Sequence, residues 1–269
     1  YDTALRIESR YLAKLMTTPV ARNMINTFFF NMNAIKSGQS RPKDVPRYKP
    51  QKVGLLGAGM MGAGIAYSQA SKGITTVLKD VSQEKADLGK SYSAKITQGR
   101  VDKGRMKPEA QQQILDLIHP TGSVADLQGC DLIIEAVFEN RGLKAQVTQE
   151  AEPMLAADGV FASNTSTLPI SGLAKSSARP EKFIGLHFFS PVDKMKLVEI
   201  IKGQLTDDET LARAYDYVNA IGKVPIVVND SRGFFTSRVF GTYVMEGAAM
   251  LAQGVPAPLI EHVAVMAGM

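Results

Sequence analysis

A histidine and a glutamate in neighbouring apolar runs could form an acid–base pair. His187 lies in GLHFFSP (185–191) and Glu199 in KLVEII (196–201). In a hairpin centred on Asp193 the two residues would face each other, with Cβ atoms roughly 4.5–5.5 Å apart. A carboxylate on one imidazole nitrogen fixes the tautomer and leaves the other nitrogen to act as a base. A purely structural His–Glu pair would have the same spacing, so both interpretations stand.

A glycine-rich turn has the pattern of a dinucleotide-binding site. The apolar run 53–56 leads into GAGMMG (57–62), and a helical pattern of small residues follows. In such a motif the first glycine permits a tight turn, the second admits the phosphates and the third allows close packing of the helix. The pyrophosphate would then lie at the helix N-terminus. We therefore predict that Gly57, Gly59 and Gly62 bind a cofactor.

An aspartate after the next predicted strand indicates which nucleotide would bind. Asp80 follows the apolar run 76–78 and lies 23 residues after Gly57. A carboxylate at this place accepts hydrogen bonds from the adenosine ribose and repels a 2′-phosphate. The sequence therefore favours NAD over NADP. The alternative is a structural glycine turn with an unrelated surface aspartate.

Two other features have both a functional and a structural interpretation. Ser166, in SNTST (163–167), could donate a hydrogen bond to a substrate oxygen, or it could cap a turn or helix. Basic residues recur over 85–107 and could bind a phosphorylated ligand such as coenzyme A, although a solvated helix has the same pattern. They are Lys85, Lys90, Lys95, Arg100, Lys103, Arg105 and Lys107.

The composition excludes several classes of protein. The hydrophobic content of 45% and the charged content of 21% are those of an ordinary globular protein. No apolar stretch approaches the ~20 residues that span a bilayer. The net charge of +5 is too small and too dispersed for a nucleic-acid-binding protein. The single cysteine, Cys130, excludes an intramolecular disulfide and favours a reducing compartment.

Strand and helix patterns alternate from Gln51 onwards and predict a mostly parallel sheet. Predicted strands cover 52–57, 75–80, 131–137, 159–163, 183–190, 196–202 and 224–229. Predicted helices cover 60–72, 82–103, 108–117, 141–156, 207–221 and 236–252. The predicted fold class is α/β, a Rossmann-like doubly wound sheet followed by the start of an all-helical domain. Ligands of such sheets bind at the carboxyl ends of the strands, where the candidate residues lie.

The pattern along the chain predicts three segments. Residues 1–50 form a helical segment followed by a Pro-rich linker. We expect the apolar residues of the helical segment to pack in a core, which could be that of an upstream domain. Residues 51–232 form the NAD-binding Rossmann domain. Residues 233–269 begin a helical C-terminal domain that is cut short. Because the chain starts with Tyr1 and ends within an apolar helical pattern, we expect a fragment of a longer protein.

The ordered set of motifs resembles that of the 3-hydroxyacyl-CoA dehydrogenases, and more closely the dehydrogenase part of multifunctional fatty-acid oxidation enzymes (the fatty oxidation complex alpha subunit). The matching motifs are GAGMMGAGIA (57–66), LKD (78–80), EAVFEN (135–140), SNTSTLPI (163–170), GLHFFSPV (185–192), LVEII (197–201) and GFF (233–235). Residues 1–40 also resemble the linker helix that follows the enoyl-CoA hydratase domain in those enzymes.

The resemblance implies NAD-dependent oxidation of a (3S)-3-hydroxyacyl-CoA to a 3-ketoacyl-CoA in fatty-acid β-oxidation. It implies that His187 is the catalytic base, that Glu199 orients it and that Ser166 contacts the 3-oxygen of the substrate. The residues that it places at the cofactor are Gly57, Gly59, Met61, Gly62, Asp80, Val137, Glu139, Lys144 and Ser166. Ser190 and Ser237 stand where many members have Asn. Serine keeps a hydrogen-bonding group but has a shorter side chain, so these two substrate contacts and the acyl-chain preference could differ.

The resemblance also implies the molecular context. It implies a hydratase domain in the same parent chain, a thiolase partner, a homodimer, and a location in the bacterial cytoplasm or the mitochondrial matrix. Two alternatives use the same fold. One is a β-hydroxy acid dehydrogenase that acts on a free acid, and the other is a non-catalytic NAD-binding domain.

Overall fold

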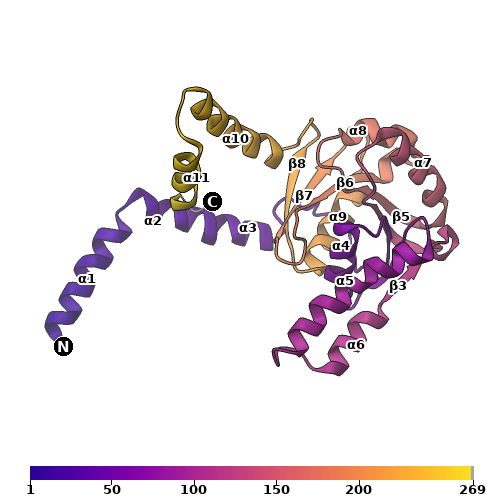
Figure 1. The fold of residues 1–269 in the computed structure, drawn as a ribbon, viewed down its shortest axis with the longest axis horizontal. Coiled ribbons are helices and arrows are strands. Elements are labelled where there is room, and N and C mark those ends of the chain that lie inside the picture. The colour runs from indigo at the N-terminus through magenta and orange to yellow at the C-terminus, as the bar shows by residue number, and fades with distance from the viewer. Residues whose placement is uncertain (268–269) are drawn as a thin grey trace. The chain divides into compact units, whose positions relative to one another are not determined.

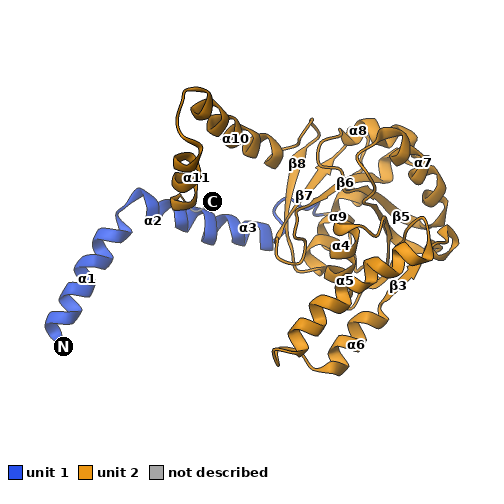
Figure 2. Ribbon diagram, viewed as in Figure 1, with its two compact units in different colours: residues 1–43 blue, residues 44–269 orange. Residues whose placement is uncertain are grey.

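A computed structural model describes residues 1–267 (Figure 1). The chain divides into two compact units, Tyr1–Lys43 and Asp44–Met269 (Figure 2). The first unit consists of helices α1 (Asp2–Met16), α2 (Pro19–Met24) and α3 (Met32–Lys36), with the π-helical stretch η1 (Ile25–Asn31) between α2 and α3. The Thr18 side chain accepts a hydrogen bond from the backbone N–H of Ala21 and caps α2, and Pro19 occupies its first turn.

We expected the apolar residues of this first unit to pack in a core, but the described residues form no such core around them. None of its helices contains a buried residue. Phe28, Phe29 and Phe30 remain 69%, 60% and 58% exposed. The assignment of 1–50 to an upstream domain, and of 233–269 to a helical domain, stays a prediction. No helix within residues 1–267 has the length and apolar content that crossing a membrane requires.

The second unit is built on an eight-stranded sheet of order β3-β2-β1-β4-β5-β6-β7-β8. The strands are β1 (Lys52–Leu56), β2 (Thr75–Lys79), β3 (Ile118–Thr121), β4 (Cys130–Glu135), β5 (Leu155–Ser163), β6 (Phe183–Phe188), β7 (Leu197–Lys202) and β8 (Val224–Asn229). Neighbouring strands from β3 to β6 are parallel, β6 and β7 pair antiparallel, and β7 and β8 are parallel again. This order confirms the Rossmann-like sheet, whose switch point lies between β1 and β4.

Helices cover both faces of the sheet. They are α4 (Met60–Ala70), α5 (Gln83–Val101), α6 (Pro108–Asp116), α7 (Arg141–Ala151), α8 (Ile170–Leu173) and α9 (Asp208–Ala220), followed by α10 (Thr236–Ala252) and α11 (Ala257–Met266). Apolar side chains of α4 and α9 form one core with the sheet, and those of α7 and α8 form the other. The strands between these cores are buried on both faces, as their apolar sequences predict.

Most predicted strands and helices are confirmed. Helix α8, however, was not predicted, and β5 begins at Leu155 rather than at the predicted residue 159. Strand β3 was not predicted, because it is a four-residue edge strand that contains His119 and Pro120. The helix predicted over 141–156 ends at Ala151, since Pro153 lies in a short 3₁₀ turn and β5 already begins at Leu155. Helix α11 was not predicted.

The chain enters the sheet at the edge opposite the carboxyl ends of the strands. Oδ2 of Asp131, at the start of β4, accepts hydrogen bonds from the backbone N–H groups of Gln51 and Lys52 at 2.7 and 2.8 Å. The Asp216 carboxylate binds the Arg47 guanidinium at 3.0 Å and the N–H of Tyr48 at 2.9 Å. The linker is therefore fixed away from the candidate site residues.

Candidate functional site

The glycine turn between β1 and α4 is shaped by backbone contacts. Gly57 has a φ of +96°, and a Cβ there would lie 2.8 Å from the carbonyl oxygen of Ala136. A Cβ on Gly62 would lie 1.8 Å from the carbonyl oxygen of Gly57. Gly59 is the N-cap of α4 and makes no side-chain cap. Among the described residues, no atom beyond Gly59 and its two chain neighbours lies within 4 Å of the place that a Cβ on Gly59 would take. The helix N-terminus is thus open towards an anion.

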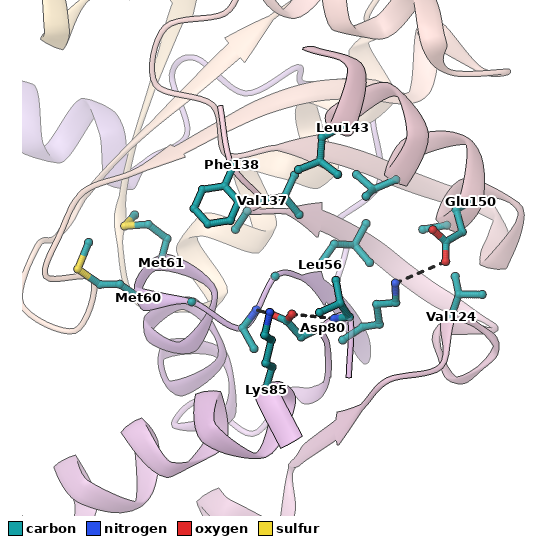
Figure 3. Close-up of a pocket in the computed structure, with 18 of the residues that line it drawn as sticks. Leu56, Met60, Met61, Asp80, Lys85, Val124, Val137, Phe138, Leu143 and Glu150 are labelled. Carbon is teal, nitrogen blue, oxygen red and sulfur yellow. Dashed lines mark hydrogen bonds and ion pairs between the residues drawn. The ribbon is translucent and has the colours of Figure 1, made fainter. Parts of the chain in front are cut away.

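A cleft of about 680 Å³ opens beside this turn. In Figure 3, Leu56, Val137 and Leu143 line its apolar wall, and Phe138, Met60 and Met61 lie at one end. Glu150, which pairs with Lys79 at 3.4 Å, lies at the other end. An apolar cleft next to an uncapped helix N-terminus fits a nucleotide whose base packs on the wall and whose phosphates meet the helix.

Asp80 lies at the end of β2, on the floor of the same cleft (Figure 3). Its Oδ2 accepts a hydrogen bond from the backbone N–H of Ala58, in the glycine turn, at 2.7 Å. Its Oδ1 accepts one from the N–H of Val81 at 2.7 Å. The carboxylate is therefore held in place beside the turn, where the sequence motif predicts contact with a ribose.

The predicted register of His187 and Glu199 is confirmed. The two residues are direct partners in the antiparallel pair β6–β7. His187 Nδ1 lies 2.7 Å from Glu199 Oε2, and both side chains are buried. The imidazole also packs against Phe189, with ring centroids 4.4 Å apart, and near Phe234, at 6.0 Å. With Nδ1 bonded to the carboxylate, Nε2 is the nitrogen that can exchange a proton with a ligand.

The charge of Glu199 is stabilised by several donors. Burial by itself raises the pKa of this carboxyl group, but the hydrogen bonds from His187 and Thr236 outweigh it and hold the pKa below its usual value. Thr236 is the first residue of α10 and lies beside Glu199 because the chain reverses at Gly233 and Phe234, whose φ angles are +76° and +46°. Glu199 is therefore a carboxylate that can stabilise a protonated imidazole.

A second buried network lies at the ends of β4 and β5. The ammonium of Lys144 binds both carboxylate oxygens of Glu135 at 2.9 Å and lies 3.3 Å from Glu139. Oε1 of Glu139 accepts hydrogen bonds from the N–H groups of Ser166 and Thr167, both at 3.2 Å. Burial by itself raises the pKa of Glu139, but the hydrogen bond from the Thr165 hydroxyl, the charge of Lys144 and the hydrogen bonds from Thr167 hold the pKa below its usual value. The network fixes the turn that carries Ser166.

Some of the predicted cofactor residues line the cleft, and others lie outside it. Gly57, Gly59, Met61, Asp80 and Val137 line the cleft. Gly62, Glu139 and Lys144 do not line it: Gly62 packs on the turn, and Lys144 is only 2% exposed beneath the loop that holds Glu139. Their contact with a cofactor stays a prediction.

The candidate serines lie along the carboxyl edge. Ser166 is half-buried in the turn after β5, and Ser237 lies in the first turn of α10. Ser190 is exposed, and its Oγ lies 3.6 Å from the sulfur of Met60. The sequence interpretation missed Thr236 and the support that Glu135 gives to Lys144, because both depend on contacts between distant segments.

The cleft and His187 lie along the same edge of the sheet. The cleft lies at β1 and β2, and His187 lies near the carboxyl end of β6, past β4 and β5. Three strand spacings of about 4.8 Å separate β1 from β6, roughly 14 Å. A dinucleotide lying across the strand ends would reach from the cleft towards the histidine.

Comparisons with known proteins agree with this arrangement. The family model of the 3-hydroxyacyl-CoA dehydrogenase NAD-binding domain matches residues 52–231. The structure of (S)-3-hydroxybutyryl-CoA dehydrogenase PaaH1 from Ralstonia eutropha is 34% identical, with a TM-score of 0.75 over 77% of this chain and 74% of that one. The structure of FadB2 from M. tuberculosis is 31% identical, with a TM-score of 0.77 over 82% and 78%.

A multifunctional enzyme is also among the similar structures. The dehydrogenase part of multifunctional enzyme 1 from C. elegans is 26% identical, with a TM-score of 0.65 over 77% of this chain and 47% of that one. The matched NAD-binding domain and the dehydrogenase relatives indicate NAD as the cofactor, which fits the open glycine turn described above. The chain therefore belongs to the 3-hydroxyacyl-CoA dehydrogenase family, whose members are NAD-dependent oxidoreductases.

Proposed function

We propose that this chain oxidises (3S)-3-hydroxyacyl-CoA to 3-ketoacyl-CoA in fatty-acid β-oxidation, with His187 as general base and Glu199 as its orienting partner. The observation that carries the proposal is the buried pair of His187 Nδ1 and Glu199 Oε2, 2.7 Å apart at the strand ends. A carboxylate held in this way favours the imidazolium that forms when the histidine takes a proton.

In the proposed reaction the 3-hydroxyl of the substrate gives its proton to His187 Nε2. NAD⁺, when bound, would accept the hydride from C3 as the carbon–oxygen double bond forms. Ser166 would donate a hydrogen bond to the 3-oxygen, and Ser190 and Ser237 would contact the substrate nearby. Glu139 fixes the turn that carries Ser166. This rigidity supports a role for Ser166 in positioning the substrate.

The proposed site for the nucleotide uses the cleft. Gly57, Gly59 and Gly62 would shape the turn for the pyrophosphate, and Asp80 would bind the adenosine ribose. Met61 and Val137 would contact the cofactor from the cleft wall. Glu139 and Lys144 would act at the neighbouring loop. The hydratase domain, the thiolase partner, the homodimer and the compartment stay predictions from the resemblance.

The test measures NADH formation with 3-hydroxyacyl-CoA substrates of graded length and with the corresponding free 3-hydroxy acids. We expect turnover with the thioesters and little with the free acids. His187→Gln should retain NAD affinity and lose activity by ~10²–10⁴-fold, because a positioned general base contributes about that much. Equal turnover of the free acids would favour the β-hydroxy acid alternative. NAD binding without any hydride transfer would favour a non-catalytic domain.

A further inference from the structure

Glu199 is held by helix α10 as well as by His187. The backbone N–H groups of Phe235 and Thr236 donate to Glu199 Oε1 at 3.1 and 2.9 Å. The hydroxyl of Thr236 donates to Oε2 at 2.7 Å. Oε2 is also the atom that bonds His187 Nδ1. The Thr236 hydroxyl and the imidazole therefore share one carboxylate oxygen.

This sharing has a geometric consequence. The two backbone donors both bind Oε1 and leave the plane of the carboxylate free to rotate about that atom. The Thr236 hydroxyl binds the other oxygen and so fixes the plane. Because the imidazole follows Oε2, fixing the carboxylate also fixes the direction of Nε2.

It also has an electrostatic consequence. In the described part of the chain, the charge that faces Glu199 is that of His187 when protonated, and α10 adds the positive end of its dipole. A hydroxyl that donates to Oε2 draws negative charge away from the imidazole. Without it the carboxylate would attract the imidazolium more strongly.

We propose that Thr236 is a positioning residue for the base: its hydroxyl holds Glu199 so that His187 presents Nε2 to the substrate. This inference rests on the proposed function. It assigns to the start of α10 a direct part in the geometry of the site.

The experiment compares Thr236→Val, which keeps the shape and the backbone N–H, with Thr236→Ser, which keeps the hydroxyl. We expect the valine variant to lose about tenfold in kcat, the size of one lost hydrogen bond to a charged group. The acid limb of its kcat/KM profile should move to higher pH. KM for the acyl-CoA and the NAD affinity should stay unchanged, and Thr236→Ser should restore both kcat and the acid limb.

Thr242→Val is the matched control, because Thr242 lies on the exposed face of the same helix and donates to the carbonyl of Val239. It should leave kcat and the pH profile unchanged. Melting temperatures are measured for all variants, and Thr236→Ala replaces the valine if the valine melts early. An unchanged pH profile in a folded variant without the hydroxyl, or a loss that serine does not restore, would overturn the proposal.

The outcome separates this inference from the proposed function. If His187→Gln keeps full activity, the proposed function fails, whatever Thr236 does. If His187→Gln is inactive while Thr236→Val matches the unsubstituted protein, only the positioning role fails.

Discussion

At the residue scale, Asp80 shows how a side chain can be prepared for a ligand. Its two oxygens already accept hydrogen bonds from the N–H groups of Ala58 and Val81. The carboxylate therefore needs no rotation to face the cleft, and its charge would repel a 2′-phosphate bound there. Two cations, Lys79 and Lys85, line the same cleft. Glu150 pairs with Lys79 there, so without the Asp80 carboxylate the charge of Lys85 would favour a phosphate.

Substitution of Asp80 should therefore change nucleotide preference. We expect Asp80→Ala to weaken NADH binding and to relax the discrimination against NADPH. Asp80→Asn keeps an acceptor for Ala58 and should bind NADH better than the alanine variant while still admitting NADPH. Fluorescence titrations with the two nucleotides measure both effects. An unchanged ratio of the two dissociation constants in both variants would contradict this role.

At the element scale, the strand–turn–helix unit of β1 and α4 separates folding from binding. A Cβ on Gly62 would meet the Gly57 carbonyl oxygen at 1.8 Å, which only a backbone shift could relieve. A Cβ on Gly59 would meet no described atom within 4 Å, and the φ of −67° suits any residue. The turn itself therefore requires a glycine at position 62. At position 59 the fold does not require glycine, but a bound ligand could.

This difference predicts opposite results for two equal substitutions. Gly62→Ala should lower the free energy of unfolding by at least ~1–3 kcal/mol, as overpacking does. Gly59→Ala should leave stability within about 0.5 kcal/mol but weaken NADH binding, because its methyl group would occupy the approach of the phosphates. Chemical denaturation and nucleotide titration of both variants check this. If Gly59→Ala binds NADH as well as the unsubstituted protein does, the pyrophosphate does not bind at this turn.

Sequence reasoning succeeded where an element is defined by local pattern. The glycine turn and the pairing of His187 with Glu199 followed from spacing and from the need of a buried charge for a partner. It failed at β3, whose short sequence with Pro120 lacks a strand pattern. It also could not place Thr236, since the contact with Glu199 depends on how the backbone turns at Phe234.

At the scale of the whole molecule, carboxylates tie distant segments together and make stability depend on pH. Glu139 joins the loop after β4 to the turn after β5, and Glu199 joins β7 to α10. Hydrogen bonds hold the pKa of both groups below the ordinary value although burial opposes the shift. A carboxyl group whose pKa is lower in the folded state stabilises the fold. This contribution is complete at pH values above the unfolded-state pKa of about 4.3, and it is lost as the pH falls through the folded-state pKa.

We therefore expect the free energy of unfolding to fall as the pH is lowered from about 6 to about 3. Glu139→Gln removes one titrating group, so its stability should decline less steeply over the same range. Burial raises the pKa of Glu135, so its effect on the pH dependence of stability has the opposite sign. Glu135 is present in both the unsubstituted protein and the Glu139→Gln variant, so its effect cancels in the comparison. Urea denaturation at stepped pH values provides the comparison. Parallel curves for the two proteins would show that Glu139 contributes nothing to the pH dependence.

The left-handed backbone at Phe234 carries a wider consequence. A bulky residue in that conformation costs ~1–3 kcal/mol, and its ring is almost fully buried near His187. Glycine or asparagine would suit the same bend better but would leave a void against the imidazole. Loss of a buried phenylalanine side chain costs about 3–5 kcal/mol, more than relief of the strain returns, so laboratory evolution for heat tolerance alone should retain Phe234.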